Sequence, residues 1–122
     1  MVSFRKFVTS SGLGVFGGRD SVNNDELVFG SAPSDVLLHT VLPGSPFVNV
    51  GSEASKNDIR EAAVFCAKFS QGWRDSKKDI FVNVFRKCDM FKDKKMKGGT
   101  WGVKKEERIR VRKSDILAFE KV

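Results

Sequence analysis

A capped amphipathic helix in the middle of the chain places the strongest constraint on the fold. Ser55 and Asp58 have the Ser-x-x-Asp spacing of a capping box, in which each side chain accepts the backbone N–H of the other residue. Apolar residues follow at intervals of three and four, which places them on one helix face; they are Ile59, Ala62, Cys66, Phe69 and Trp73. The pattern predicts a helix that begins at Ser55, ends near Gly72 and packs Cys66 into a core.

Short β-prone segments surround this helix and indicate a mixed fold. Ser10-Ser11-Gly12 separates the first two segments and predicts a β-hairpin. A second helix is expected from Asp20 or Ser21 to about Phe29. Leu42-Pro43-Gly44 predicts a turn that joins two further strands. The expected strand segments are residues 4–9, 13–16, 36–41, 45–50, 80–85, 100–103, 109–112 and 116–119.

Together these elements predict an α+β domain with a mainly antiparallel sheet and two helices, in the order β-β-α-β-β-α-β-β-β, with one further short strand among the late segments. The 122 residues correspond to one domain, and 40% apolar residues with eleven Phe suffice for a core. Two Cys and one His exclude a disulfide framework and a standard zinc site. We expect no cofactor, no metal and no membrane span, and a soluble protein of the reducing cytoplasm.

Positive charge is concentrated in the second half of the chain. Residues 1–60 contain five Lys/Arg and six Asp/Glu, whereas residues 61–122 contain seventeen and nine. Residues 86–113 alone contain twelve basic and four acidic residues, which leaves a net charge of +8. A surplus of this size favours a polyanionic partner, most simply nucleic acid.

This basic segment is the first candidate site. Arg108, Arg110 and Arg112 alternate with apolar residues and would line one face of a strand about 7 Å apart. A Lys-rich loop precedes them, and Trp101 could stack on a base. The alternative is a solvated charged surface with Trp101 in the core, but the density of charge exceeds what solubility needs. The predicted nucleic-acid contacts are Arg86, Lys87, Lys92, Lys94, Lys95, Lys97, Trp101, Lys104, Lys105, Arg108, Arg110 and Arg112.

Two weaker candidates lie in the nearly neutral first half. Gly17-Gly18-Arg19-Asp20 is a glycine turn before a helix, where free N–H groups and Arg19 favour a phosphate. The simpler interpretation is a structural turn in which Arg19 pairs with a carboxylate. His39 could act as an acid or base, although a lone His in an apolar strand is more often a packed residue. No partner for a catalytic triad stands out around it.

Several segments of the chain together resemble the sequence pattern of one known family. Residues 4–12 have the sequence Phe-Arg-Lys-Phe-Val-Thr-Ser-Ser-Gly. Residues 17–28, the most specific segment, have the sequence Gly-Gly-Arg-Asp-Ser-Val-Asn-Asn-Asp-Glu-Leu-Val. Asp35-Val-Leu-Leu-His39, Pro43-Gly-Ser45 and the Ala-Ala helix over residues 61–70 continue the pattern in the same order. The family that these segments resemble is the NFACT-R module, a predicted RNA-binding domain of the NFACT ribosome-quality-control proteins.

The sequence departs from the family pattern in two places. Val36 and Leu37 stand where the family usually has an aromatic residue, which weakens any stacking role for that strand. Gly98-Gly99 stands in place of a common Pro-Gly, and the turn is retained because Gly is still present. The positions that match family motifs are Arg19, Asp20, Asn24, His39, Gly44, Ser45 and Ser70.

The resemblance implies a role in translation, since the full-length proteins bind the large ribosomal subunit and tRNA and extend stalled nascent chains. We expect residues 1–122 to form a single RNA-binding module, because they leave no room for the other domains of those proteins. The preferred hypothesis is a non-catalytic protein that binds rRNA or tRNA through residues 86–113. A smaller polar site would consist of Arg19, Asp20, Asn24, His39 and Ser45.

Two alternatives from other functional classes stay open at this point. The first is an enzyme that acts on RNA or a nucleotide, with Arg19 holding phosphate, His39 as acid or base and Asp20 orienting one of them. The second is an interaction module that binds DNA or an acidic protein, because phosphate contacts alone do not distinguish DNA from RNA.

Overall fold

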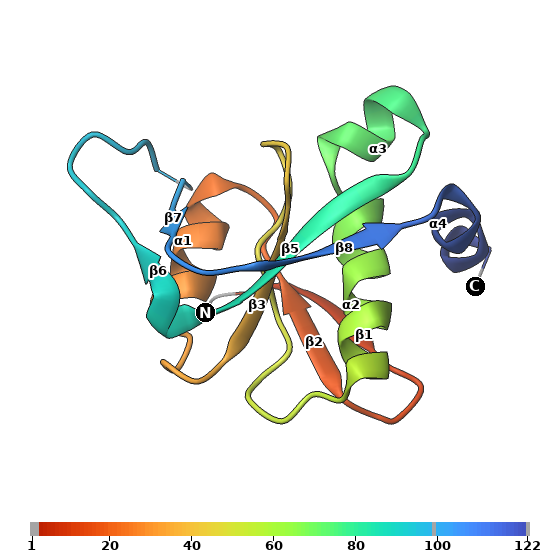
Figure 1. Ribbon diagram of the computed structural model, residues 1–122, viewed down its shortest axis with the longest axis horizontal. Coiled ribbons are helices and arrows are strands. Elements are labelled where there is room, and N and C mark those ends of the chain that lie inside the picture. The colour runs from red at the N-terminus through yellow and green to blue at the C-terminus, as the bar shows by residue number, and fades with distance from the viewer. Residues whose placement is uncertain (1–2, 99, 122) are drawn as a thin grey trace.

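The computed structural model describes residues 3–98 and 100–121, and it confirms an α+β domain with a mainly antiparallel sheet (Figure 1). The main sheet has the strand order β1-β2-β4-β3-β5-β8, and each neighbouring pair is antiparallel. Its strands are β1 (Arg5–Val8), β2 (Gly14–Gly17), β3 (Val36–Thr40), β4 (Val48–Asn49), β5 (Ile80–Arg86) and β8 (Glu107–Val111). A separate ribbon pairs β6 (Met90–Phe91) with β7 (Gly102–Val103).

Helices cover both faces of the sheet because its central strands are apolar on both sides. Leu38 of β3 packs in the core beneath α2 (Lys56–Lys68) and α4 (Lys113–Glu120). Leu37, the preceding residue, points the other way and packs with Leu27 and Val28 of α1 (Ser21–Phe29). In Figure 1, α1 and the β6–β7 ribbon accordingly lie on one side of the sheet, and α2 and α4 lie on the other.

The predicted capping box is confirmed, but the helix that it begins is shorter than expected. Ser55 Oγ accepts the Asp58 N–H at 3.0 Å, and Asp58 Oδ2 accepts the Ser55 N–H at 3.0 Å. The helix α2 ends at Lys68, because Ser70 caps a separate short helix, α3 (Gln71–Ser76), by accepting the Trp73 N–H. Trp73 is buried as predicted, but it reaches the core from α3.

The strand predicted at residues 116–119 is wrong, since these residues belong to α4. Ile116 and Phe119, three positions apart, both pack against the main core from one helix face. The opening hairpin is confirmed as the β1–β2 pair. The strand expected over residues 45–50 shortens to β4, since Pro46 has no N–H and Phe47 donates its N–H to Asn24 Oδ1 instead of to a neighbouring strand.

The last part of the chain also differs from the prediction. Only Gly102–Val103 of the segment 100–103 forms a strand. Gly99, half of the Gly98-Gly99 turn discussed above, lies outside the described residues. A short 3-10 turn, η1 (Lys87–Asp89), leads from β5 into the ribbon. Among the residues that are described, no helix is both long and apolar enough to cross a membrane.

Candidate functional site

The start of α1 is fixed by hydrogen bonds from the residues that lead into it. Asp20 Oδ1 accepts the Asn23 N–H at 2.8 Å, so this carboxylate caps the helix. The Arg19 N–H donates to Asn23 Oδ1 at 3.0 Å, which fixes the Arg19 backbone. The Arg19 side chain is exposed, and no described residue hydrogen-bonds or ion-pairs with its guanidinium. Arg19 therefore keeps a cationic side chain available beside the helix.

Asn24 and Ser45 fasten α1 to the segment before β4. Asn24 Oδ1 accepts the Phe47 N–H at 2.9 Å, and Asn24 Nδ2 donates to the Ser45 carbonyl at 3.3 Å. Ser45 Oγ accepts the Thr40 N–H at 3.1 Å and donates to the Pro46 carbonyl at 2.7 Å. Both side chains are buried. They act as internal braces that position the residues around them.

His39 presents a neutral ring to the same region. Its ring centroid lies 4.4 Å from that of Phe47. Nδ1 lies 2.7 Å from the Thr40 carbonyl, and because a carbonyl oxygen only accepts, Nδ1 carries a proton. Burial lowers the pKa of His39 below its usual 6.5, so the ring is neutral at pH 7. Nε2 is then an unprotonated acceptor to which no described residue donates.

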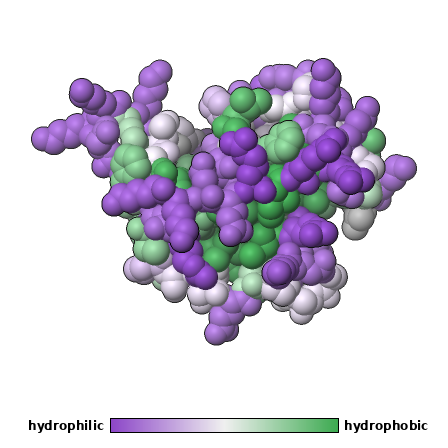
Figure 2. Space-filling view, viewed as in Figure 1, coloured by the Kyte–Doolittle hydropathy of each residue, from purple (hydrophilic) through white to green (hydrophobic). Residues whose placement is uncertain are grey.

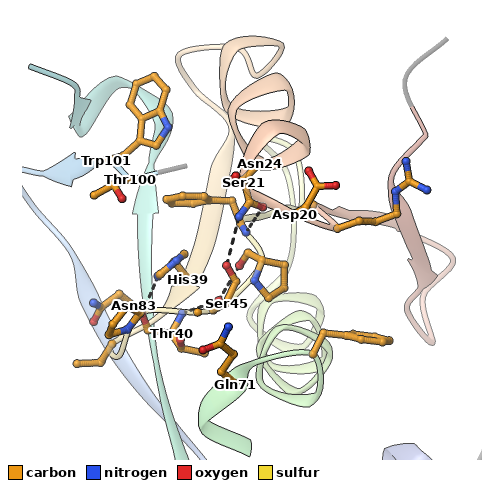
Figure 3. Close-up of a pocket in the computed structure, with 18 of the residues that line it drawn as sticks. Asp20, Ser21, Asn24, His39, Thr40, Ser45, Gln71, Asn83, Thr100 and Trp101 are labelled. Carbon is orange, nitrogen blue, oxygen red and sulfur yellow. Dashed lines mark hydrogen bonds between the residues drawn. The ribbon is translucent and has the colours of Figure 1, made fainter. Parts of the chain in front are cut away.

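These side chains line one pocket with a volume of about 740 Å³. Figure 3 shows Asp20 near the start of α1 on one side of the pocket and His39 with Asn83 on the opposite side. Gln71 of α3 closes a third side of the pocket. Its backbone N–H donates to the Gly44 carbonyl at 2.7 Å. Gly44 has a φ of +87°, and a Cβ there would lie 2.7 Å from the Gln71 side chain, so both backbone and space require glycine.

Arg5 brings a second cation to this pocket from β1. Its guanidinium donates to the Gly18 carbonyl at 2.7 Å and lies 4.5 Å from the centroid of the Phe69 ring. Burial and then the positive charge of Arg19 lower the pKa of Arg5, and the charge of Asp20 opposes them. Arg5 and Arg19 are therefore close enough to repel each other. An anion bound between them would relieve that repulsion.

Asn83 lies beside His39 in the pocket lining, and Arg108 follows it on the next strand of the sheet. The register places His39 opposite Asn83 and Asn83 opposite Arg108, so the three side chains form a row on one sheet face. Asn83 Oδ1 is buried without a hydrogen-bond partner among the described residues. Sequence reasoning missed Arg5 and Asn83. Their positions depend on strand pairing, and only the alternation of side chains along β1 and β5 gives a weak signal for them.

The basic segment contains both paired and unpaired cations. Lys92 pairs with Asp25 at 3.1 Å, Arg110 pairs with Asp79 at 2.6 Å, and Arg86 donates to a backbone carbonyl at 2.8 Å. The other predicted cations, which we call the basic surface, make no side-chain hydrogen bond or ion pair with any described residue. They are Lys87, Lys94, Lys95, Lys97, Lys104, Lys105, Arg108 and Arg112. Figure 2 shows hydrophilic side chains projecting over the loop between β6 and β7.

Trp101 is half-buried at the rim of the pocket, so it is neither a fully exposed stacking residue nor a core residue. Its Nε1–H donates to Asp25 Oδ1 at 3.0 Å, and its ring centroid lies 5.1 Å from that of Phe29. Lys92 Nζ lies 4.8 Å from the centroid of the indole. These contacts fasten the start of β7 to α1, and so they hold the end of the Lys-rich loop next to the pocket.

Comparison with known proteins identifies the family. The sequence model of a protein family, described as the NFACT protein RNA-binding domain, matches residues 3–105. The chain belongs to this family. A solved structure, the C-terminal part of the fibronectin/fibrinogen-binding protein from Streptococcus suis, matches with a TM-score of 0.81 and 20% identity. The match covers 95% of this chain and 48% of that one, so the chain spans about half of its length and shares its fold. No curated protein matches.

Some of the NFACT-R motif residues hold the domain together, and others keep groups that could bind a ligand. Asp20, Asn24 and Ser45 form hydrogen bonds within the domain, as described above. Arg19 and His39 keep a guanidinium and an Nε2 atom that no described residue engages. The motif therefore both builds the pocket and supplies part of its binding chemistry.

In the described ranges, the three residues of the alternative enzyme hypothesis are not linked to one another. No hydrogen bond or ion pair joins any two of Arg19, Asp20 and His39 there. The buried Cys66 lies 3.5 Å from Ser45 Oγ, and burial raises the pKa of its thiol to about 12, so it is a poor nucleophile. The described residues also contain no group of three or more His, Cys, Asp or Glu placed to hold a metal.

Proposed function

We propose that this NFACT-R domain binds rRNA or tRNA without catalysing a reaction, and that the basic surface makes the main contacts. The observation that carries the proposal is the set of exposed cations without a protein partner, above all Lys94, Lys95 and Lys97. An unpaired lysine gains by exchanging solvent for phosphate, and each such contact releases counterions from the RNA. A role in translation, in the cytoplasm and on the large ribosomal subunit, is part of this proposal.

Charge reversal tests the proposal directly. The triple variant Lys94→Glu, Lys95→Glu and Lys97→Glu should bind RNA more weakly whatever its sequence, because phosphate contacts carry no sequence information. Loss of three contacts should also reduce the slope of log affinity against log salt by about 2 for single strands. Between 50 and 200 mM salt the wild type should therefore lose roughly 16-fold more affinity than the variant.

A matched control separates local contact from overall charge. Lys56, Arg60 and Lys78 are exposed, make no side-chain hydrogen bond or ion pair with described residues and lie outside the basic surface. Their reversal to Glu changes the net charge equally and should alter RNA affinity far less. Equal effects of the two triple variants, or none, would contradict the proposal. Preference for duplex DNA over RNA, or complexes that resist nuclease, would favour the alternative of a DNA-binding or protein-binding module.

A further inference from the structure

One side of the pocket is suited to a phosphate group. Arg5 is held in place by the Gly18 carbonyl at 2.7 Å and by the Phe69 ring, so its guanidinium is oriented before any ligand arrives. Arg19 adds an exposed guanidinium on the same side, with no partner among the described residues. Asp20, the nearby carboxylate, already caps α1. This side therefore presents one oriented guanidinium, that of Arg5, and one exposed guanidinium, that of Arg19, to an anion.

The opposite side is suited to a base. The protonated Nδ1 of His39 leaves Nε2 as an acceptor, which complements the ring or exocyclic N–H donors that each RNA base has. Asn83 lies next to His39 in the strand register, and its amide has a buried oxygen without a partner. Rotation of that amide would present either a donor or an acceptor to a ligand.

Size and surroundings restrict what can enter. A volume of about 740 Å³ is comparable to other small-ligand sites but is too small for a duplex. Gly98, Thr100 and Trp101 line the pocket, and they follow the lysines of the loop directly in the chain. An RNA strand held by the basic surface would therefore pass beside the pocket opening.

We propose that this pocket accepts one unstacked nucleotide of the bound RNA, with its phosphate at Arg5 and Arg19 and its base at His39 and Asn83. The inference rests on the proposed RNA-binding function, and it identifies a single nucleotide as the part of the RNA that occupies the pocket. Nucleotides within a continuous duplex are excluded, because their base edges are already paired.

A titration with single nucleotides tests the pocket without relying on RNA binding. AMP, GMP, CMP and UMP are each added to the 15N-labelled domain, and ribose 5-phosphate serves as the ligand without a base. We expect saturable shifts of the Arg19, Thr40 and Thr100 amides with the nucleotides, and at least tenfold weaker binding of ribose 5-phosphate. The absence of shifts at these amides, or equal binding of ribose 5-phosphate, would overturn the proposal.

Two variants then test the assigned groups. Arg19→Gln removes the exposed cation, and His39→Asn removes the Nε2 acceptor while retaining an N–H that can reach the Thr40 carbonyl. Each should weaken nucleotide binding about tenfold, with thermal unfolding as the check on folding. Lys56→Gln, which removes an exposed cation on α2, should leave it unchanged. Unchanged nucleotide binding in both pocket variants would refute the assignment.

RNA of two forms distinguishes failure of this inference from failure of the proposed function. Arg19→Gln with His39→Asn should reduce affinity for a single-stranded 12-mer about tenfold and leave a blunt 12-base-pair duplex unaffected. The Lys94, Lys95 and Lys97 reversal should weaken both forms. Equal loss with both RNAs in the pocket variant would contradict the nucleotide site. Failure of the wild type to bind either RNA would contradict the proposed function, while the nucleotide titration still decides the pocket.

Discussion

Replacement of Asn24 by Ala should destabilise the domain by about 2–4 kcal/mol, because this side chain braces two backbone groups. It is 8% exposed, accepts the Phe47 N–H at 2.9 Å and donates to the Ser45 carbonyl at 3.3 Å. Alanine leaves both groups without these bonds, and a buried unsatisfied group costs about 1–3 kcal/mol. The carbonyl contributes the smaller part, since its hydrogen bond is longer. For a domain of this size the melting temperature should fall by roughly 10 °C.

Urea and thermal unfolding measure this loss, and Asn57→Ala is the matched control. Asn57 is exposed, and its Nδ2 donates to Glu61 at 3.1 Å. Loss of this surface contact should cost less than about 0.5 kcal/mol. Folded Asn24→Ala that retains wild-type stability but no longer binds RNA would refute the reasoning. Asn24 would then be a ligand contact, and the brace would contribute little.

Three further predictions follow from the buried contacts. Gly18→Ala should lower the urea midpoint strongly, because the added methyl group would collide with Asn24 Oδ1. Hydrogen bonds, first from the Ser11 hydroxyl, lower the pKa of Asp58 from 3.8 to about 2. The stability that Asp58 provides should be complete above about pH 4 and decline as the pH falls towards 2, and Asp58→Asn should flatten that decline in acid titrations of the urea midpoint. The Cys66 thiol should react with a disulfide reagent only after unfolding, so a thiol count should rise when urea is added.

The parts of the fold that the sequence predicts well depend on local signals. The capping box at Ser55 and the opening hairpin require only residues a few positions apart, and both are confirmed. The boundary at Ser70 was missed because the apolar spacing continues through it, although its hydroxyl caps a new helix. Residues 116–119 were misassigned because a short apolar run fits either a strand or a helix. Only packing against α2 determines which one forms.

The site was partly predictable for a similar reason. Charge density along the chain indicates where cations are abundant, but not which of them are paired. Lys92 and Arg110 lie within the basic segment, yet their charges are matched by Asp25 and Asp79, which lie 67 and 31 positions away. The motif spacing likewise does not reveal that Asn24 turns inward. Such distinctions arise from tertiary contacts between segments that are distant in sequence.

Contacts between the neutral first half and the basic second half explain how the two candidate surfaces become one. Asp25 of α1 accepts hydrogen bonds from Trp101 and Lys92, and Phe29 packs against the indole. The positive charge of Lys92 is balanced by Asp25, so Lys92 helps to fasten the loop to α1 and is not available to bind a phosphate. The lysines of the loop that follows keep their charge and are held beside the pocket. A surface that both attracts RNA and admits one of its nucleotides needs paired residues that fix its shape as well as unpaired cations. Cations alone attract the phosphate backbone but do not determine which nucleotide lies at the pocket.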